Sequence, residues 1–275
     1  MIIDSHQHFW KYDPVNHAWI DDSMAVIRKD FMPSDLQALY QENGVDGCVA
    51  VQADQTLEET NFLLDLSIKN KFIKGVVGWV DLRASDLEKT LETYSNEAKL
   101  KGFRHIVQGE SDHNFLLRSD FLKGIGFLEK YDYTYDILIF PHQLGAALEF
   151  VKRFPNQKFV IDHMAKPYIK DGFYDGWATL MREIAKHENV YCKMSGMTTE
   201  ADFKAWTPNQ MQPYMELVLN AFGTDRILYG SDWPVCLVAG NYSKTKKLIT
   251  DFIAALTTNE QQKIMGANAI EFYKL

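Results

Sequence analysis

The chain of 275 residues is poor in cysteine, has no excess of basic residues and contains no long apolar run. Its three cysteines, Cys48, Cys192 and Cys236, form no CxxC pair and lie in or beside apolar stretches, so we expect buried free thiols. No stretch approaches the roughly 18 consecutive apolar residues of a membrane helix. The net charge of −8 argues against a nucleic-acid partner, because phosphate binding requires a basic surface. We therefore expect a disulfide-free cytoplasmic protein without membrane or nucleic-acid partners, while the sequence leaves the oligomeric state open.

Two nucleotide-binding signatures are also missing, since the chain has neither a GxGxxG turn nor a P-loop. Short apolar runs rich in valine, isoleucine and aromatic residues nevertheless recur along its whole length. They predict strands at 2–8, 47–53, 73–81, 102–108, 134–140, 159–163, 190–194 and 227–231. Helical patterns lie between them, several with glycine or proline at an end, and include 34–43, 57–70, 86–97, 143–154, 174–187 and 209–222.

Eight strands that alternate with helices are typical of a (β/α)₈ barrel or of an open, doubly wound sheet. An open sheet that binds a dinucleotide needs a glycine-rich turn after its first strand, where this chain has the sequence HQHFW at 6–10. No linker or low-complexity segment divides the chain. We therefore predict an α/β fold, a (β/α)₈ TIM barrel that forms a single domain over residues 1–275.

The first predicted strand carries two imidazoles, His6 and His8. Successive side chains of a strand alternate faces, so both should point the same way. Imidazole is the commonest protein metal ligand and titrates near neutrality. The pair therefore indicates two ligands of one metal or an acid–base cluster, and a polar strand with two surface histidines is the alternative.

Polar residues also end later strands, with His163 after the sixth and Asp232 after the eighth. The carboxyl ends of barrel strands converge on one mouth, so we expect these residues to meet His6 and His8 there. Such a set of three nitrogens and one oxygen could hold Zn²⁺. It could also act without metal, with Asp232 deprotonating water. A core histidine and a turn or helix-cap aspartate are the structural alternatives.

Arg104 should point into the barrel, on the same face of its strand as Gly102. Substrate recognition and a structural ion pair are equally open for it, and the sequence does not decide whether Arg104 or His105 faces the pocket. Lys193 could likewise bind substrate or form a structural ion pair. A lysine at a strand end can also easily reach solvent.

Together these motifs resemble the amidohydrolase superfamily. The closest resemblance is to its lactonase branch, which contains L-fuconolactonase, L-rhamnonolactonase and 2-pyrone-4,6-dicarboxylate lactonase. The resemblance spans essentially the whole chain. The segments that carry it are 4–10 (DSHQHFW), 102–105 (GFRH), 160–167 (VIDHMAKP), 193–197 (KMSGM) and 222–234 (FGTDRILYGSDWP).

The resemblance implies hydrolytic chemistry at the mouth of the barrel. It matches His6, His8, His163 and Asp232 to the catalytic and metal-ligating positions, and Arg104 to the arginine that holds substrate in the pyrone lactonase. The fourth strand ends in neither the lysine nor the glutamate that would bridge a second metal. One divalent metal, with zinc the first choice, or none is therefore expected.

The resemblance predicts a lactonase that opens a small sugar-acid lactone, similar to L-fuconolactone or L-rhamnonolactone, to the aldonic acid. Asp232 would take a proton from water, and the hydroxide would attack the ring ester carbonyl. Gln52, Trp79 and His142 are predicted to recognise substrate hydroxyls, with packing or capping as the alternative. A metal-dependent decarboxylase of a small unsaturated or aromatic acid, and a non-catalytic small-molecule-binding barrel, are the competing hypotheses.

Overall fold

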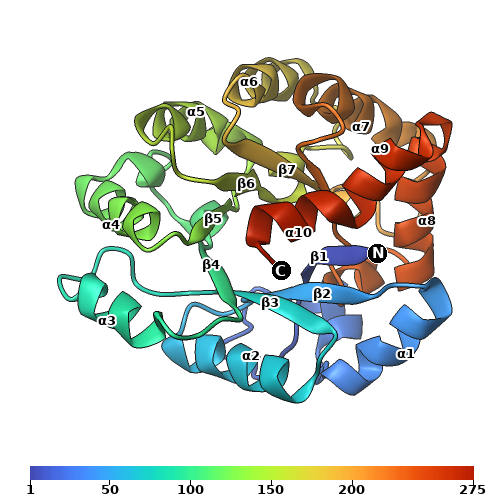
Figure 1. The fold of residues 1–275 in the computed structure, drawn as a ribbon. Coiled ribbons are helices and arrows are strands. Elements are labelled where there is room, and N and C mark those ends of the chain that lie inside the picture. The colour runs from blue at the N-terminus through green and yellow to red at the C-terminus, as the bar shows by residue number, and fades with distance from the viewer.

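The computed structural model describes residues 1–275 as eight strands that alternate with helices (Figure 1). The strands are β1 (Ile3–Gln7), β2 (Gly47–Val51), β3 (Ile73–Gly78), β4 (Leu100–His105), β5 (Thr134–Ile137), β6 (Phe159–Ile161), β7 (Val190–Met194) and β8 (Ile227–Tyr229). They form one sheet in the order β1 to β8, and every pair of neighbours is parallel. The eight predicted strands and the predicted TIM barrel are confirmed.

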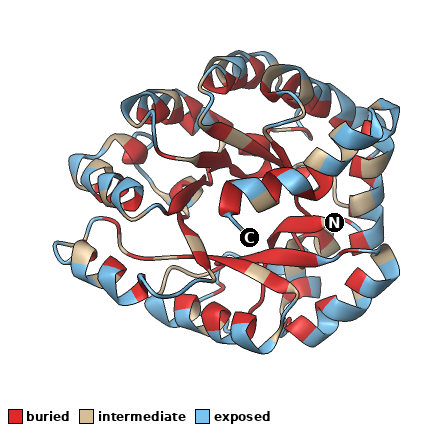
Figure 2. Ribbon diagram, viewed as in Figure 1, coloured by how far each residue is buried: buried red, intermediate tan, exposed pale blue.

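A ring of helices surrounds the strands and turns its buried side toward them (Figures 1 and 2). The helices are α1 (Pro33–Asn43), α2 (Leu57–Lys69), α3 (Leu87–Tyr94), α4 (Ser119–Lys130), α5 (Leu144–Arg153), α6 (Asp175–Ala185), α7 (Pro208–Phe222), α8 (Tyr242–Phe252), α9 (Thr258–Gln262) and α10 (Asn268–Tyr273). Helix α1 ends at Gly44, whose φ of +62° is a conformation that glycine adopts without strain. None of these helices combines the length and the apolar composition that crossing a membrane requires.

The first and last strands meet and complete the barrel. Gln7 pairs with Trp233 in a parallel bridge. The amide of His8 donates to the Trp233 carbonyl at 2.7 Å, and the amide of Asp232 donates to the His6 carbonyl at 2.8 Å. Residues from the two ends of the sequence therefore lie side by side at this junction.

An irregularity in β1 directs its side chains. Three residue steps from Asp4 to Gln7 face only two steps of β2, from Cys48 to Ala50, so β1 holds one extra residue there. Such a bulge changes which face the following side chains point to. Asp4 accepts hydrogen bonds from Tyr40 of α1 and Tyr242 of α8, outside the barrel. His6 and His8 lie on the same inner side, with their Nε2 atoms 3.2 Å apart.

Helix α10 covers the amino-terminal end of the barrel, the face seen in Figure 1. Its residues Phe272 and Tyr273 pack against Ile3, Val49 and other apolar side chains of the barrel interior. The core is therefore closed at this end, and a site for a small molecule is left to the opposite end, where the strand-to-helix loops lie.

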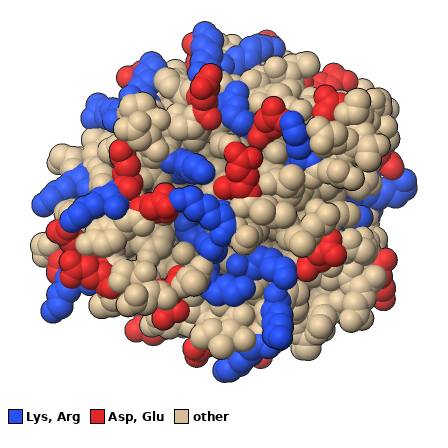
Figure 3. All heavy atoms as spheres, in the orientation of Figure 1, with Lys and Arg blue, Asp and Glu red and all other residues tan.

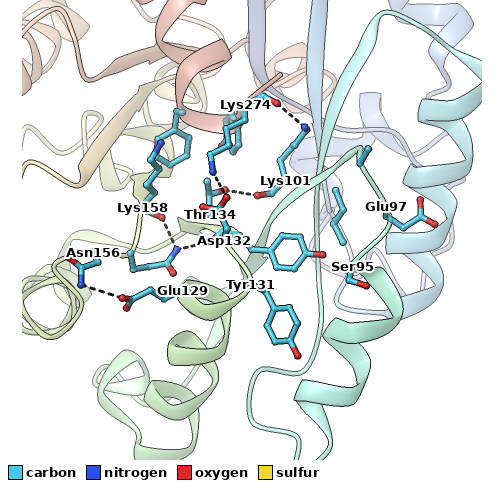
Figure 4. A pocket seen from close by; sticks show the side chains of 16 residues that line it. Ser95, Glu97, Lys101, Glu129, Tyr131, Asp132, Thr134, Asn156, Lys158 and Lys274 are labelled. Atoms are coloured by element: carbon cyan, nitrogen blue, oxygen red, sulfur yellow. Dashed lines mark hydrogen bonds and ion pairs between the residues drawn. The ribbon is translucent and has the colours of Figure 1, made fainter.

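A shallow cavity of about 320 Å³ does open beside α10, at the starts of β4, β5 and β6 (Figure 4). Lysine and arginine side chains gather near the centre of this face, mixed with acidic ones (Figure 3). Lys101 donates to the Lys274 carbonyl at 2.8 Å, and Lys274 forms an ion pair with Asp132. None of the possible metal-holding groups of histidines and carboxylates lies here, and this end of a TIM barrel ordinarily serves stability.

Candidate active site

The sequence-predicted residues His6, His8, His163 and Asp232 meet at the carboxyl ends of the strands. Asp232 Oδ1 lies 3.5 Å from His8 Nε2, 3.8 Å from His163 Nε2 and 3.9 Å from His6 Nε2. All four residues are buried, with at most 4% of their surface exposed. A polar cluster of this density in the interior indicates a functional site, because burying polar groups costs free energy.

Two of these residues stand on strained backbone. His163 has a φ of +53° in η5 (Asp162–Ala165), the turn that follows β6, and Asp232 has a φ of +56° just beyond β8. Left-handed conformations cost a non-glycine residue about 1–2 kcal/mol and tend to persist where function requires them. In both cases the strained turn directs the side chain into the barrel mouth.

Small residues make room for the imidazoles. A Cβ atom on Gly196 would lie 2.4 Å from His163 Nδ1, and one on Gly230 would lie 2.7 Å from the His6 Cβ. Gly196 also has a φ of +64°, which favours glycine. These two glycines therefore let β7 and β8 approach the histidines.

Hydrogen bonds fix the proton positions on two of the rings. His8 Nδ1 lies 2.8 Å from the Val51 carbonyl, which can only accept, so His8 Nδ1 carries the proton. Arg104 Nη1, a donor only, lies 3.2 Å from His6 Nε2, so this nitrogen of His6 accepts. His6 Nδ1 lies 3.3 Å from Asp162 Oδ1 and 3.1 Å from Lys193 Nζ.

The third ring has a hydroxyl partner, because His163 Nδ1 lies 2.9 Å from Ser195 Oγ. A proton on Nδ1 donated to this hydroxyl leaves the Nε2 lone pair facing Asp232, as in the other two rings. His8 and His163 are thus held through their Nδ1 atoms by a carbonyl and a hydroxyl, the kind of support that orients metal-binding histidines.

The electrostatics keep the imidazoles neutral and the carboxylate ionised. Burial lowers the pKa of His8, places the pKa of His6 well below its ordinary value, and lowers the pKa of His163 to about 4. Burial by itself raises the pKa of Asp232, but its contacts with His163 and His8 outweigh this effect, and the pKa falls. An arrangement in which imidazolium cations replace a metal is therefore disfavoured.

This donor set fits a divalent metal. Ligands at about 2.1 Å from a tetrahedral ion lie about 3.4 Å from one another. His6 Nε2, His8 Nε2 and Asp232 Oδ1 lie 3.2 to 3.9 Å apart, and His163 Nε2 lies 3.8 Å from this carboxylate oxygen. The His6, His8 and Asp232 group satisfies the geometric requirement for one ion. Three neutral nitrogens with one carboxylate are the ligand types that zinc prefers.

Arg104, and not His105, faces the site. Its Nη1 donates to Asp162 Oδ2 at 2.9 Å, while its Nε and Nη2 donate to Gln52 Oε1 at 3.2 and 2.9 Å. His105 turns away to Glu110 and Trp79. The guanidinium is thus committed to protein partners, although it still lines the cavity.

Lys193 lies beneath the histidines and is completely buried, so the expectation that it could reach solvent is wrong. Its Nζ lies 2.5 Å from Asp136 and 3.0 Å from Asp162. Tyr273 of α10 donates to Asp136 at 2.8 Å. A chain of polar contacts therefore runs through the barrel from α10 to His6.

Sequence reasoning missed most of this chain of contacts. Asp162 directly precedes His163, and Asp136 stands in a predicted apolar strand between Tyr135 and Ile137. The available signal was that a carboxylate in a strand buried on both faces requires a partner, and Lys193 in another such strand could supply it.

A cavity of about 340 Å³ lies above the cluster and is lined by His8, Arg104, His163 and Asp232 among others. Trp79 and His142, predicted to bind substrate, do not line it. Trp79 Nε1 donates to His105, and the exposed His142 lies 3.0 Å from the Tyr168 hydroxyl. Gln52 lies below the cavity and holds Arg104. Recognition of substrate hydroxyls by these residues stays a prediction.

The family model of the amidohydrolases matches residues 3–275 of the chain. An L-fucono-1,5-lactonase from Burkholderia multivorans is 36% identical over 99% of this chain and 96% of its own length. The L-rhamnono-gamma-lactonase of Scheffersomyces stipitis is 27% identical over 75% of this chain and 70% of its own. A crystal structure of a Burkholderia multivorans amidohydrolase with bound zinc has a TM-score of 0.96 and 36% identity, and covers 100% of this chain and 99% of that one. The chain belongs to the amidohydrolase family.

Proposed function

We propose that the chain is a lactonase that hydrolyses a small sugar-acid lactone, similar to L-fuconolactone or L-rhamnonolactone, to the aldonic acid. The observation that carries this proposal is the convergence of three imidazole Nε2 atoms and one carboxylate on the floor of a cavity. The chain in which they converge matches an L-fucono-1,5-lactonase along nearly its whole length.

One divalent ion, with zinc the first candidate, would be held by His6, His8, His163 and Asp232. When bound, it supplies Lewis acidity that polarises the ring carbonyl and favours an ionised water. The related zinc-bound amidohydrolase supports this ion, and so does the separation of the His6, His8 and Asp232 donors.

Asp232 is the proposed base. Its Oδ1 lies among the imidazole nitrogens, and no hydrogen bond occupies its Oδ2. Its lowered pKa keeps it ionised at neutral pH, so the carboxylate can accept a proton from water.

The hydroxide then forms a bond to the carbonyl carbon of the lactone. The bond from this carbon to the ring oxygen breaks, and Asp232 returns its proton to that oxygen as a hydroxyl. Arg104, which lines the cavity, places a positive charge close to the oxyanion that develops. The products balance as one lactone and one water giving one aldonic acid.

The test is the substitution Asp232→Asn, which preserves shape and removes the base. We expect a loss of turnover of at least about 1000-fold on L-fuconolactone, with an unchanged unfolding midpoint of the chelated protein. Asp225→Asn is the matched control, because Asp225 is exposed and pairs with Lys263 far from the cavity. Turnover within tenfold of wild type in Asp232→Asn would rule out this base.

The competing hypotheses receive less support. The structural similarity to a 5-carboxyvanillate decarboxylase, at 12% identity, extends to the fold alone. A non-catalytic barrel has no need for four converging polar groups, two of them on strained backbone. Release of an acid without carbon dioxide from the substrate would separate the lactonase from the decarboxylase.

A further inference from the structure

One ion pair in the cavity wall has no part in the reaction described above. Lys166 Nζ lies 3.0 Å from Glu200 Oε1, and the two side chains are only 18% and 13% exposed. Both line the same cavity as His163 and Asp232. A surface ion pair such as Lys247 with Asp251 is far more open, at 72% and 62%.

The backbone directs this pair toward the site. Lys166 follows η5 and has a φ of +48°, so it completes the left-handed turn that begins at His163. Glu200 is the last residue of η6 (Met197–Glu200), which follows β7. The pair therefore joins the loops after β6 and β7 at the edge of the cavity.

Most of the hydrogen-bonding capacity of the pair is unused. An ammonium group has three donors, and Glu200 is the one carboxylate within ion-pair distance of Lys166. The Glu200 carboxylate likewise contacts one cation. These groups suit vicinal hydroxyls, each of which donates one hydrogen bond and accepts another.

The charges of the wall are balanced. Its two permanent cations are Arg104, paired with Asp162, and Lys166, paired with Glu200. A substrate that carries extra carboxylates would find no free cation here and would lie against the carboxylate of Glu200. An uncharged ring that carries several hydroxyls meets no such repulsion.

We infer that Lys166 and Glu200 form a hydroxyl-recognition pair that selects neutral polyhydroxylated lactones over lactones bearing a carboxylate. The inference rests on the proposed lactonase function and names the substrate class of the same site. The pair binds adjacent ring hydroxyls and holds the ring carbonyl over Asp232.

The experiment compares three lactones: L-fuconolactone, unsubstituted δ-valerolactone, and an aldaric acid monolactone as the anionic probe. The variants are Lys166→Met, Glu200→Gln and their combination, which leaves no unpaired charge behind. Lys263→Met removes an exposed ion pair with Asp225 and is the control. The readouts are kcat/KM for each lactone and the unfolding midpoint.

We expect each of the three variants to lower the ratio of kcat/KM for L-fuconolactone to that for δ-valerolactone by about 30-fold. Glu200→Gln should also lower KM for the anionic lactone by about tenfold, because it leaves the charge of Lys166 unpaired. Lys166→Met should not lower this KM.

Ratios within threefold of wild type, or equal losses on both neutral lactones, would overturn the recognition role. An unchanged KM for the anionic lactone in Glu200→Gln would overturn the charge selection. Wild-type protein that hydrolyses none of the three lactones would overturn the proposed function itself, and the inference with it.

Discussion

Gly196 offers a test of how closely the site is packed, through the substitution Gly196→Ala. A Cβ atom there would lie 2.4 Å from His163 Nδ1, 2.6 Å from its Cγ and 2.9 Å from its Cβ. Ordinary contacts begin near 3.4 Å, so the imidazole must move by roughly 1 Å. This movement pulls Nδ1 from the Ser195 hydroxyl, which lies at 2.9 Å.

Two losses add up in the free energy of unfolding that we expect for Gly196→Ala. The left-handed φ of +64° costs alanine about 1 kcal/mol, and the lost hydrogen bond costs about another 1 kcal/mol. A total of about 2 kcal/mol lowers the unfolding midpoint by roughly 6 °C in a protein of this size. A displacement of 1 Å in a catalytic group lowers turnover by about 100-fold.

Gly44→Ala is the matched control. Gly44 has a φ of +62°, and nothing lies within 4 Å of an added Cβ atom. It should therefore show the backbone cost alone, a midpoint lower by roughly 3 °C, with unchanged turnover. Both variants are compared by thermal unfolding and by acid release from L-fuconolactone. Turnover in Gly196→Ala equal to that in Gly44→Ala would refute the packing argument for His163.

Three further predictions concern stability. Lys193→Met leaves Asp136 without its buried cation and should lower the free energy of unfolding by about 3 kcal/mol. The exposed Lys263→Met should lower it by less than about 0.5 kcal/mol. Equal unfolding midpoints of the two variants would contradict this. Burial raises the pKa of Glu59 to about 8 from an ordinary 4.5, so the free energy of unfolding should fall as pH rises between these values. Glu59→Gln should flatten that dependence in urea titrations, and an unaltered slope would disprove the assignment. Zinc added after chelation should raise the unfolding midpoint of the wild-type protein and leave that of His8→Ala unchanged. An equal rise in both midpoints would contradict the role of His8 as a ligand.

The strand pattern of the fold was readable from the sequence because each strand of a helix-covered barrel is an unbroken apolar run. The convergence of His6, His8, His163 and Asp232 could also be predicted from the sequence, because polar residues that end such runs lie at one end of the barrel. The bulge in β1 could not be predicted, because it depends on the pairing with β2, which no local sequence pattern encodes.

Pairings between distant residues account for most of what was missed. Asp136 and Lys193 stand 57 positions apart, and each resembles an isolated polar residue within an apolar strand. The directions of loop side chains were equally hidden. Trp79 follows β3 near the mouth, yet its indole turns to His105, and Lys166 reaches the cavity because four successive residues adopt left-handed backbone.

The junction of β1 with β8 has a consequence for how the protein is made. His6 leaves the ribosome some 226 positions before Asp232, and the chain segments that carry them join each other. A growing chain therefore holds His6 and His8 without their carboxylate until the residues after β8 have been made. Barrel closure and assembly of the reactive centre are one event, so fragments released early have no working site.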